Sequence, residues 1–163
     1  MSHNPPPTPR SADEQNRFER ALTKLFEEQV TFNQVLGLKV VRFGPNGPVM
    51  RFDMRPELVG SYMHGRLHGG VISAALDTTG GMVLVWAIGQ KHAHESTAQV
   101  MQRFVRFGTI DLRVDYLRPG IGKAFEASAE VMRLGSRVGT AQMRLVNEEG
   151  VLIATATGAY ICS

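Results

Sequence analysis

The chain has 163 residues, of which 43% are hydrophobic and 20% are charged, and its formal net charge at pH 7 is +3. This composition is ordinary for a soluble globular protein, and the length is ample for one hydrophobic core. The positive charge is mild and forms no basic run interleaved with aromatic residues, so we expect no nucleic-acid partner, although an anionic small molecule would suit it. Cys162 is the only cysteine, so no disulfide can form within the chain, which suits a cytoplasmic protein.

The N-terminal part combines a polar tail with a helical segment. Residues 1–12 are rich in proline, serine and asparagine, so we expect a disordered tail, and they hold no apolar stretch typical of a signal peptide. Over residues 12–34, apolar side chains recur at spacings of three and four, which predicts an amphipathic helix. We expect this helix to pack on the flank of a single domain that comprises residues 13–163.

Strand patterns lie on both sides of one long apolar stretch. Residues 38–43 and 48–54 are predicted to be two strands joined by a tight turn, and a loop over residues 55–66 follows. After Gly108, four segments with apolar and polar residues in alternation are separated by short turns. These segments span residues 110–116, 125–131, 141–145 and 151–162. Consecutive strands with short turns predict an antiparallel meander.

The apolar stretch from Gly69 to Gln90 carries one charged residue, Asp77. Its alanines and leucines favour one long buried helix over residues 70–89. The glycine pair Gly80-Gly81 weakens this helix, so we expect a packing reason for it, such as the close approach of another backbone. No other predicted element is apolar enough to cover the apolar face of the sheet. The predicted fold is therefore α+β, with an antiparallel sheet wrapped around one long central helix.

A membrane span is the competing interpretation of this stretch. Residues 71–89 are nearly long enough to cross a bilayer. Asp77 opposes insertion, because an aspartate at the centre of a span costs about 2.5–3.5 kcal/mol on insertion scales. We therefore expect no membrane partner.

Asp77 is the first candidate for chemistry, because burying an unpaired carboxylate is costly. Either it bonds to a polar loop or a nearby hydroxyl such as Ser73, or it serves as a base or nucleophile in an apolar cleft. Gly69 and Gly70 lie at the predicted helix start, where unshielded N–H groups stabilise a developing oxyanion. A simple turn that lets the chain enter the helix is the other interpretation of these glycines.

The spacing of these candidates has a consequence for the architecture. Gly69 and Asp77 are eight residues apart, so a helix separates them by about 12 Å along its axis. One chain therefore cannot bring both groups to the same carbonyl carbon. Two copies that lie antiparallel across a two-fold axis can, which predicts two identical sites in a dimer.

Two motifs resemble those of a known family. Leu67–Gly70 followed by Leu76-Asp77, and the later segment Thr109–Pro119, resemble the signatures of hotdog-fold acyl-CoA thioesterases, over roughly residues 35–162. The phenylacetate-pathway and 4-hydroxybenzoyl-CoA thioesterase-like group is the most similar. The resemblance implies a hotdog fold, hydrolysis of fatty or aryl acyl-CoA, no cofactor, and a homodimer or dimer of dimers with sites between subunits. It also implies that Asp77 is the general base or nucleophile and that the Gly69 N–H forms the oxyanion hole.

The resemblance suggests further substrate-binding residues. Many family members carry an asparagine a few residues before the His-Gly-Gly motif, and Tyr62 aligns with it here, so Tyr62, His64 or water would have to fill that role. His68 is expected to shape the glycine turn. Ser73 and Thr78 are candidates to position water, although either hydroxyl could instead bond to a helix carbonyl.

Two arginines are the candidates for the coenzyme A phosphates. Arg118 and Arg137 lie in regions where related thioesterases often place basic residues, and the alternative is that both are solvated turn residues. Residues 91–107 look longer than the family's usual link, and they could hold a short helix that covers the cleft or merely pads it.

Other functions fit the sequence less well. His64 and His68 lack a third ligand, so we expect no metal site. Ser73 lies in no Gly-x-Ser-x-Gly elbow, which disfavours a serine hydrolase, and Cys162 is expected to be a strand-end residue rather than a nucleophile. Dehydration of hydroxyacyl thioesters would need a histidine on the central helix. A non-catalytic acyl-CoA binding or sensing module on the same fold is the main alternative.

Overall fold

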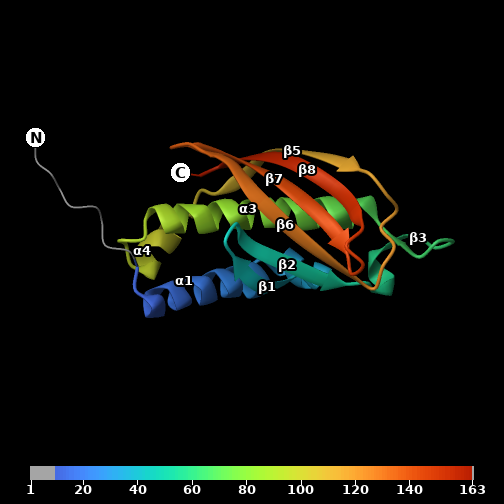
Figure 1. The fold of residues 1–163 in the computed structure, drawn as a ribbon, viewed down its shortest axis with the longest axis horizontal. Coiled ribbons are helices and arrows are strands. Elements are labelled where there is room, and N and C mark those ends of the chain that lie inside the picture. Colours follow the sequence, from blue (N-terminus) through green and yellow to red (C-terminus); the bar gives the residue numbers. More distant parts are fainter. Residues whose placement is uncertain (1–9, 163) are drawn as a thin grey trace, which may run out of the picture.

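The computed structural model describes residues 10–162, in which a six-stranded antiparallel sheet curls around one long helix. This helix is α3 (Gly69–Lys91), and Figure 1 shows the sheet passing over it. The strands follow the order β1-β2-β6-β7-β8-β5. They are β1 (Lys39–Gly44), β2 (Gly47–Asp53), β5 (Gly108–Tyr116), β6 (Ala124–Leu134), β7 (Val138–Asn147) and β8 (Leu152–Ile161). The predicted α+β fold with one central helix is confirmed.

The position of β5 corrects the predicted four-stranded meander. β6, β7 and β8 are consecutive neighbours, but β5 pairs with β8 and lies at the sheet edge. Residues 117–123 lead the chain from that edge to β6, which pairs with β2 (Figure 1). Alternation of apolar and polar residues indicates which side of a strand is buried, but it contains no information about which strand lies beside it.

The glycine pair within α3 has the expected packing reason, although side chains rather than a backbone approach it. A Cβ atom on Gly80 would overlap the Tyr160 hydroxyl and lie 2.9 Å from the Met143 sulfur. Both side chains come from the covering sheet. By length and composition α3 could cross a membrane, yet most of its apolar window is buried within the fold, as expected of a core helix.

The predicted helix over residues 12–34 is present but is broken into three pieces. These are α1 (Ala12–Lys24), the π-helical turn η1 (Leu25–Gln29) and α2 (Thr31–Leu36). Ser11 caps α1 by accepting a hydrogen bond from the Glu14 N–H. Residues 1–9 of the predicted tail lie outside the described residues, whereas Arg10 donates a 3.1 Å hydrogen bond to the Gly89 carbonyl.

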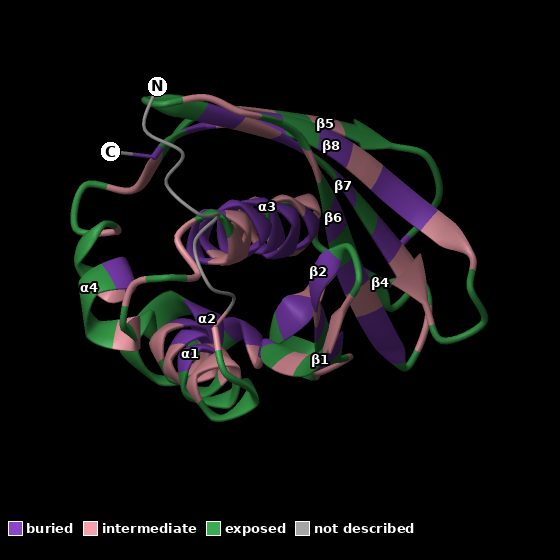
Figure 2. Cartoon of the chain, turned by 60° about the vertical axis from the view of Figure 1, so that its left-hand side comes forward, coloured by how far each residue is buried: buried purple, intermediate pink, exposed green. Residues whose placement is uncertain are grey.

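Short elements lead into and out of α3. The predicted loop over residues 55–66 contains one 3₁₀ turn and most of a small hairpin. These are η2 (Pro56–Leu58), β3 (Val59–Ser61) and β4 (Arg66–Leu67). A short helix, α4 (Thr97–Gln102), is present in the segment after α3. Figure 2 shows α1, α2 and α4 on the side of α3 that the sheet leaves open, so α3 is enclosed by both layers.

Candidate active site

Asp77 lies midway along α3 and is half-buried. The Thr109 hydroxyl, at the start of β5, donates a 2.9 Å hydrogen bond to Asp77 Oδ1. The hydroxyl that we suggested from sequence, Ser73, instead donates to the Gly70 carbonyl at 3.1 Å. Asp77 therefore has a polar partner from a strand that follows it by 32 residues, and the sequence offered no signal for this contact.

Tyr160 on β8 supports the backbone behind this carboxylate. Its hydroxyl donates to the Asp77 carbonyl at 3.1 Å. Burial, together with the nearby negative charge of Asp77, raises the pKa of Tyr160. Tyr160 therefore stays protonated at neutral pH and acts as a hydrogen-bond donor rather than as a base.

A hollow of about 270 Å³ opens beside the Asp77 carboxylate. One side is the face of α3 that carries Asp77, Thr78, Gly81 and Val85. The other sides are apolar and come from η1 and from residues 104–109. A larger hollow of about 530 Å³ surrounds the β1–β2 turn, but none of the predicted site residues lines it. The smaller hollow is therefore the one that combines an apolar lining with a candidate catalytic group.

The N-terminus of α3 presents one backbone donor. His68 is the N-cap, and its Nδ1 accepts a 2.9 Å hydrogen bond from the Gly70 N–H. This bond engages Gly70 and leaves the Gly69 N–H as the orphan donor at the positive end of the helix. The Gly69 carbonyl accepts a 3.0 Å hydrogen bond from the Tyr116 hydroxyl. We had considered Gly70 as a second oxyanion donor, and in this structure His68 occupies it.

A second hollow, of about 330 Å³, surrounds this helix start and is lined by Gly69, Arg66 and Arg118, among others. It shares no residue with the hollow at Asp77. Within one chain the two candidate groups are thus separated, as eight residues of helix require. A complete site needs the helix start of one chain and the carboxylate of another.

Thr78 joins α3 to α2 through a residue that sequence analysis missed. Its hydroxyl donates to Asn33 Oδ1 at 3.0 Å, and the Asn33 amide donates to the Phe26 carbonyl at 2.8 Å. Asn33 is 1% exposed, so its polar groups need these partners. The Thr78 hydroxyl proton is therefore used for packing, although Thr78 still borders the hollow at Asp77.

The remaining candidates lie apart from one another. Tyr62, at the tip of the β3–β4 hairpin, is 91% exposed. Arg118 donates to the Leu152 carbonyl at 3.0 Å and borders the hollow at Gly69. Arg137 follows Gly135 and Ser136, which line a hollow at the far end of α3. The two arginines of one chain therefore lie at opposite ends of the central helix.

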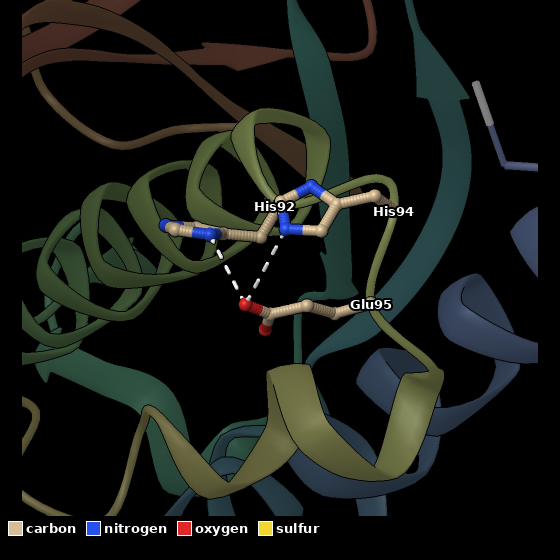
Figure 3. A group of neighbouring side chains, drawn as sticks. All are labelled: His92, His94 and Glu95. Carbon is tan, nitrogen blue, oxygen red and sulfur yellow. Dashed lines mark ion pairs between the residues drawn. The ribbon is translucent and has the colours of Figure 1, made fainter. Parts of the chain in front are cut away.

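One cluster of potential metal ligands was not foreseen. Ligand atoms of His92, His94 and Glu95 lie within 4.8 Å of one another, and Figure 3 shows both rings directed at the carboxylate. Both oxygens of Glu95, however, accept hydrogen bonds from Arg103, which holds the pKa of Glu95 down at about 2. A bound cation would have to compete with this guanidinium. The cluster is therefore explained as an ion-pair centre that joins the end of α3 to α4.

Cys162 shows no sign of activation. Its side chain is buried, and burial raises the pKa of the thiol. A thiol that stays protonated is a poor nucleophile, which agrees with the expected role of Cys162 as a strand-end residue.

A sheet wrapped around a central helix, with one carboxylate beside an apolar hollow, defines a hotdog-fold protein built to hold an acyl group. A family model for the thioesterase superfamily matches residues 64–154. The chain is 41% identical over 138 residues to the medium/long-chain acyl-CoA thioesterase YigI of Escherichia coli, covering 85% of this chain and 89% of YigI. The chain therefore belongs to the thioesterase superfamily.

Solved structures agree with this assignment. A protein of Shewanella oneidensis related to the thioesterase superfamily superposes with a TM-score of 0.86 at 35% identity, covering 94% of this chain and 99% of that one. A candidate thioesterase from Syntrophus aciditrophicus gives a TM-score of 0.78 at 32% identity, covering 94% and 100% of the two chains. The predicted superfamily is confirmed.

Proposed function

We propose that this protein hydrolyses acyl-CoA thioesters to a free acid and coenzyme A. The observation that carries the proposal is the Asp77 carboxylate, which Thr109 holds at the edge of an apolar hollow. The name of the similar protein YigI, a medium/long-chain acyl-CoA thioesterase, supports fatty acyl groups as substrates. An aryl-acyl group remains the other substrate class that the sequence suggested.

The reaction would use two elements of the site. As general base, Asp77 accepts a proton from water while the water oxygen bonds to the thioester carbonyl carbon. As nucleophile, its carboxylate attacks that carbon first, and water later cleaves the resulting anhydride. In both routes the carbonyl oxygen becomes an oxyanion that the Gly69 N–H of the second subunit stabilises. The carbon–sulfur bond then breaks, and coenzyme A leaves as a thiolate that takes up a proton.

The edge position of β5 supports a homodimer. An unpaired edge strand is a template for pairing with another chain, and β5 and the residue after it expose apolar side chains. These are Ile110, Tyr116 and Leu117, each at least half exposed. Antiparallel pairing of two β5 strands across a two-fold axis would set the two α3 helices side by side. This arrangement agrees with a composite site, and two such dimers could pair further.

The remaining candidates take supporting roles in this proposal. Arg118 shares a hollow with Gly69, which supports contact with the phosphates of coenzyme A. Arg137 would reach them only from another position in the assembly. Tyr62 stands on an exposed hairpin tip, which suits contact across the subunit interface. Catalysis on this scheme needs no metal or cofactor, and the cytoplasm is the proposed location.

A non-catalytic acyl-CoA binding module is the alternative function. It would need the hollow but not the carboxylate, so the presence of Asp77 favours the enzyme. The test is the release of free coenzyme A from a panel of acyl-CoA substrates, detected with a thiol reagent. Turnover of at least one substrate is expected. Tight binding without turnover across the whole panel would support the binding module instead.

A further inference from the structure

One wall of the hollow beside Asp77 runs along α3. Residues 104–109, which connect α4 to β5, line the hollow together with the helix face from Asp77 to Val85. Thr109 meets Asp77 through their 2.9 Å hydrogen bond. Phe104 is at the far end of this segment, and Val85 is at the far end of the helix face. The hollow is therefore a channel that begins at the carboxylate and follows the helix.

Gly81 keeps the middle of this channel open. A Cβ atom on Gly81 would lie 3.3 Å from the Phe107 ring, which is tighter than an ordinary contact, so alanine there would narrow the channel. The neighbouring Gly80 faces the sheet instead, where Tyr160 leaves no space for a Cβ atom. The two glycines thus serve different purposes, because Gly80 permits packing and Gly81 provides space.

The wall opposite the helix is fixed by polar contacts. Thr97, at the start of α4, donates from its N–H and its hydroxyl to Glu14 Oε1, each at 2.8 Å, which holds α4 against α1. Arg103, at the end of α4, donates from Nε to Glu95 at 2.8 Å. A wall that is held at both ends of α4 can give the channel a constant depth.

The helix sets the length of the channel. Asp77 and Val85 are eight residues apart, so the channel extends about 12 Å beyond the carboxylate. A carbon–carbon bond of about 1.5 Å gives a zigzag chain an advance of about 1.3 Å per carbon, so about nine carbons fit. We propose that this channel receives the acyl chain and measures its length, with Gly81 and Phe104 as the residues that determine specificity. This inference rests on the proposed hydrolysis at Asp77, and it names straight medium-length acyl chains as the preferred substrates.

The test measures kcat/KM for saturated acyl-CoA substrates of increasing length. For the unaltered protein, each added carbon should raise kcat/KM up to about fourfold until about nine carbons, because a buried methylene contributes that much. In Gly81→Ala the rise should end at about five carbons, since Gly81 lies about 6 Å from Asp77 along the helix. Phe104→Ala removes the far wall and should extend the rise to longer chains.

Two control variants separate measurement of the chain from damage to the fold. Val105→Ala changes an 82% exposed neighbour of Phe104 and should leave the length profile unchanged. Gly80→Ala should lower the melting temperature without moving the end of the rise. A uniform loss over all lengths in Gly81→Ala, or a wild-type profile with no limit near the predicted length, would overturn the proposal.

Binding of non-hydrolysable thioether analogues, measured by calorimetry, distinguishes this inference from the proposed function. If no acyl-CoA is hydrolysed but Kd improves with length to the same limit, the channel stands and the proposed hydrolysis fails. If hydrolysis proceeds while neither kcat/KM nor Kd depends on chain length, the enzyme stands and the length-measuring channel fails.

Discussion

The Thr109 hydroxyl lies 2.9 Å from Asp77 Oδ1 and joins the edge strand of the sheet to the middle of the central helix. This bond fixes the direction in which the carboxylate faces the apolar hollow. Thr109→Val keeps the shape of the side chain and removes the donor. We expect kcat to fall roughly tenfold to a hundredfold, since a hydrogen bond to a charged group contributes about 1.5–3 kcal/mol.

The conservative replacement separates positioning from packing. Thr109→Ser retains the donor and should recover most of kcat, whereas KM should change little in either variant. Steady-state kinetics with one acyl-CoA substrate measures both quantities. If the serine variant is as impaired as the valine variant, the methyl group matters and the hydrogen bond does not.

The composite site predicts recovery of activity on mixing two inactive chains. Gly69→Pro removes the oxyanion donor, and proline is tolerated at the first position of a helix, so the fold should survive. Asp77→Asn removes the carboxylate. After subunit exchange, half of the dimers should be mixed with one intact site each, so about a quarter of the wild-type activity should return.

Size-exclusion chromatography and a tag on one chain would verify that mixed dimers form. If mixed dimers are recovered and remain inactive, a site within one chain becomes the better account. An active Gly69→Pro homodimer would show that this N–H is not the oxyanion donor.

Sequence patterns located the central helix and Asp77 because a long run with one charge is visible without any partner. They did not reveal Thr109 or Asn33 as partners, since these contacts join residues 32 and 45 positions apart. They also gave β5 the wrong neighbour, because alternation describes one strand at a time. The break between α1 and α2 had no clear signal either, as the apolar spacing continues through it.

Arg118 provides a test of where the nucleotide binds. Arg118→Ala should raise KM for acyl-CoA about tenfold, the scale of one charge-assisted hydrogen bond, with little change in kcat, because phosphate contacts act equally on ground and transition states. An acyl-pantetheine substrate, which lacks the nucleotide, should be processed equally well by both proteins. Equal losses on the two substrates would indicate that the bond from Arg118 to the Leu152 carbonyl supports the fold instead. Arg137→Ala is the comparison at the other end of α3.

The Glu95–Arg103 pair predicts a defined dependence of stability on pH. The pKa of Glu95 is lowered from 4.5 to about 2, chiefly by its hydrogen bonds from Arg103. A carboxylate with a lowered pKa stabilises the folded state above its unfolded pKa, and this contribution is lost as the pH falls toward the folded pKa. The melting temperature of Glu95→Gln should therefore lie below that of the wild type at pH 6, and the gap should shrink between pH 4.5 and pH 2.

Glu57→Gln is the matched control, since Glu57 is exposed, and it should leave the melting temperature unchanged over this range. A constant gap between wild type and Glu95→Gln from pH 6 to pH 2 would mean that the charge of Glu95 does not stabilise the protein.

The most direct test of the whole account is the rate of acyl-CoA hydrolysis by Asp77→Asn. The amide keeps the size of the side chain and can still accept the hydrogen bond from Thr109, so the fold and the dimer should persist, as circular dichroism and chromatography can verify. It can neither accept a proton from water nor attack a carbonyl, so kcat should fall by at least about 100-fold, the usual scale for an acid–base group. A folded, dimeric Asp77→Asn protein with wild-type kcat would contradict the account.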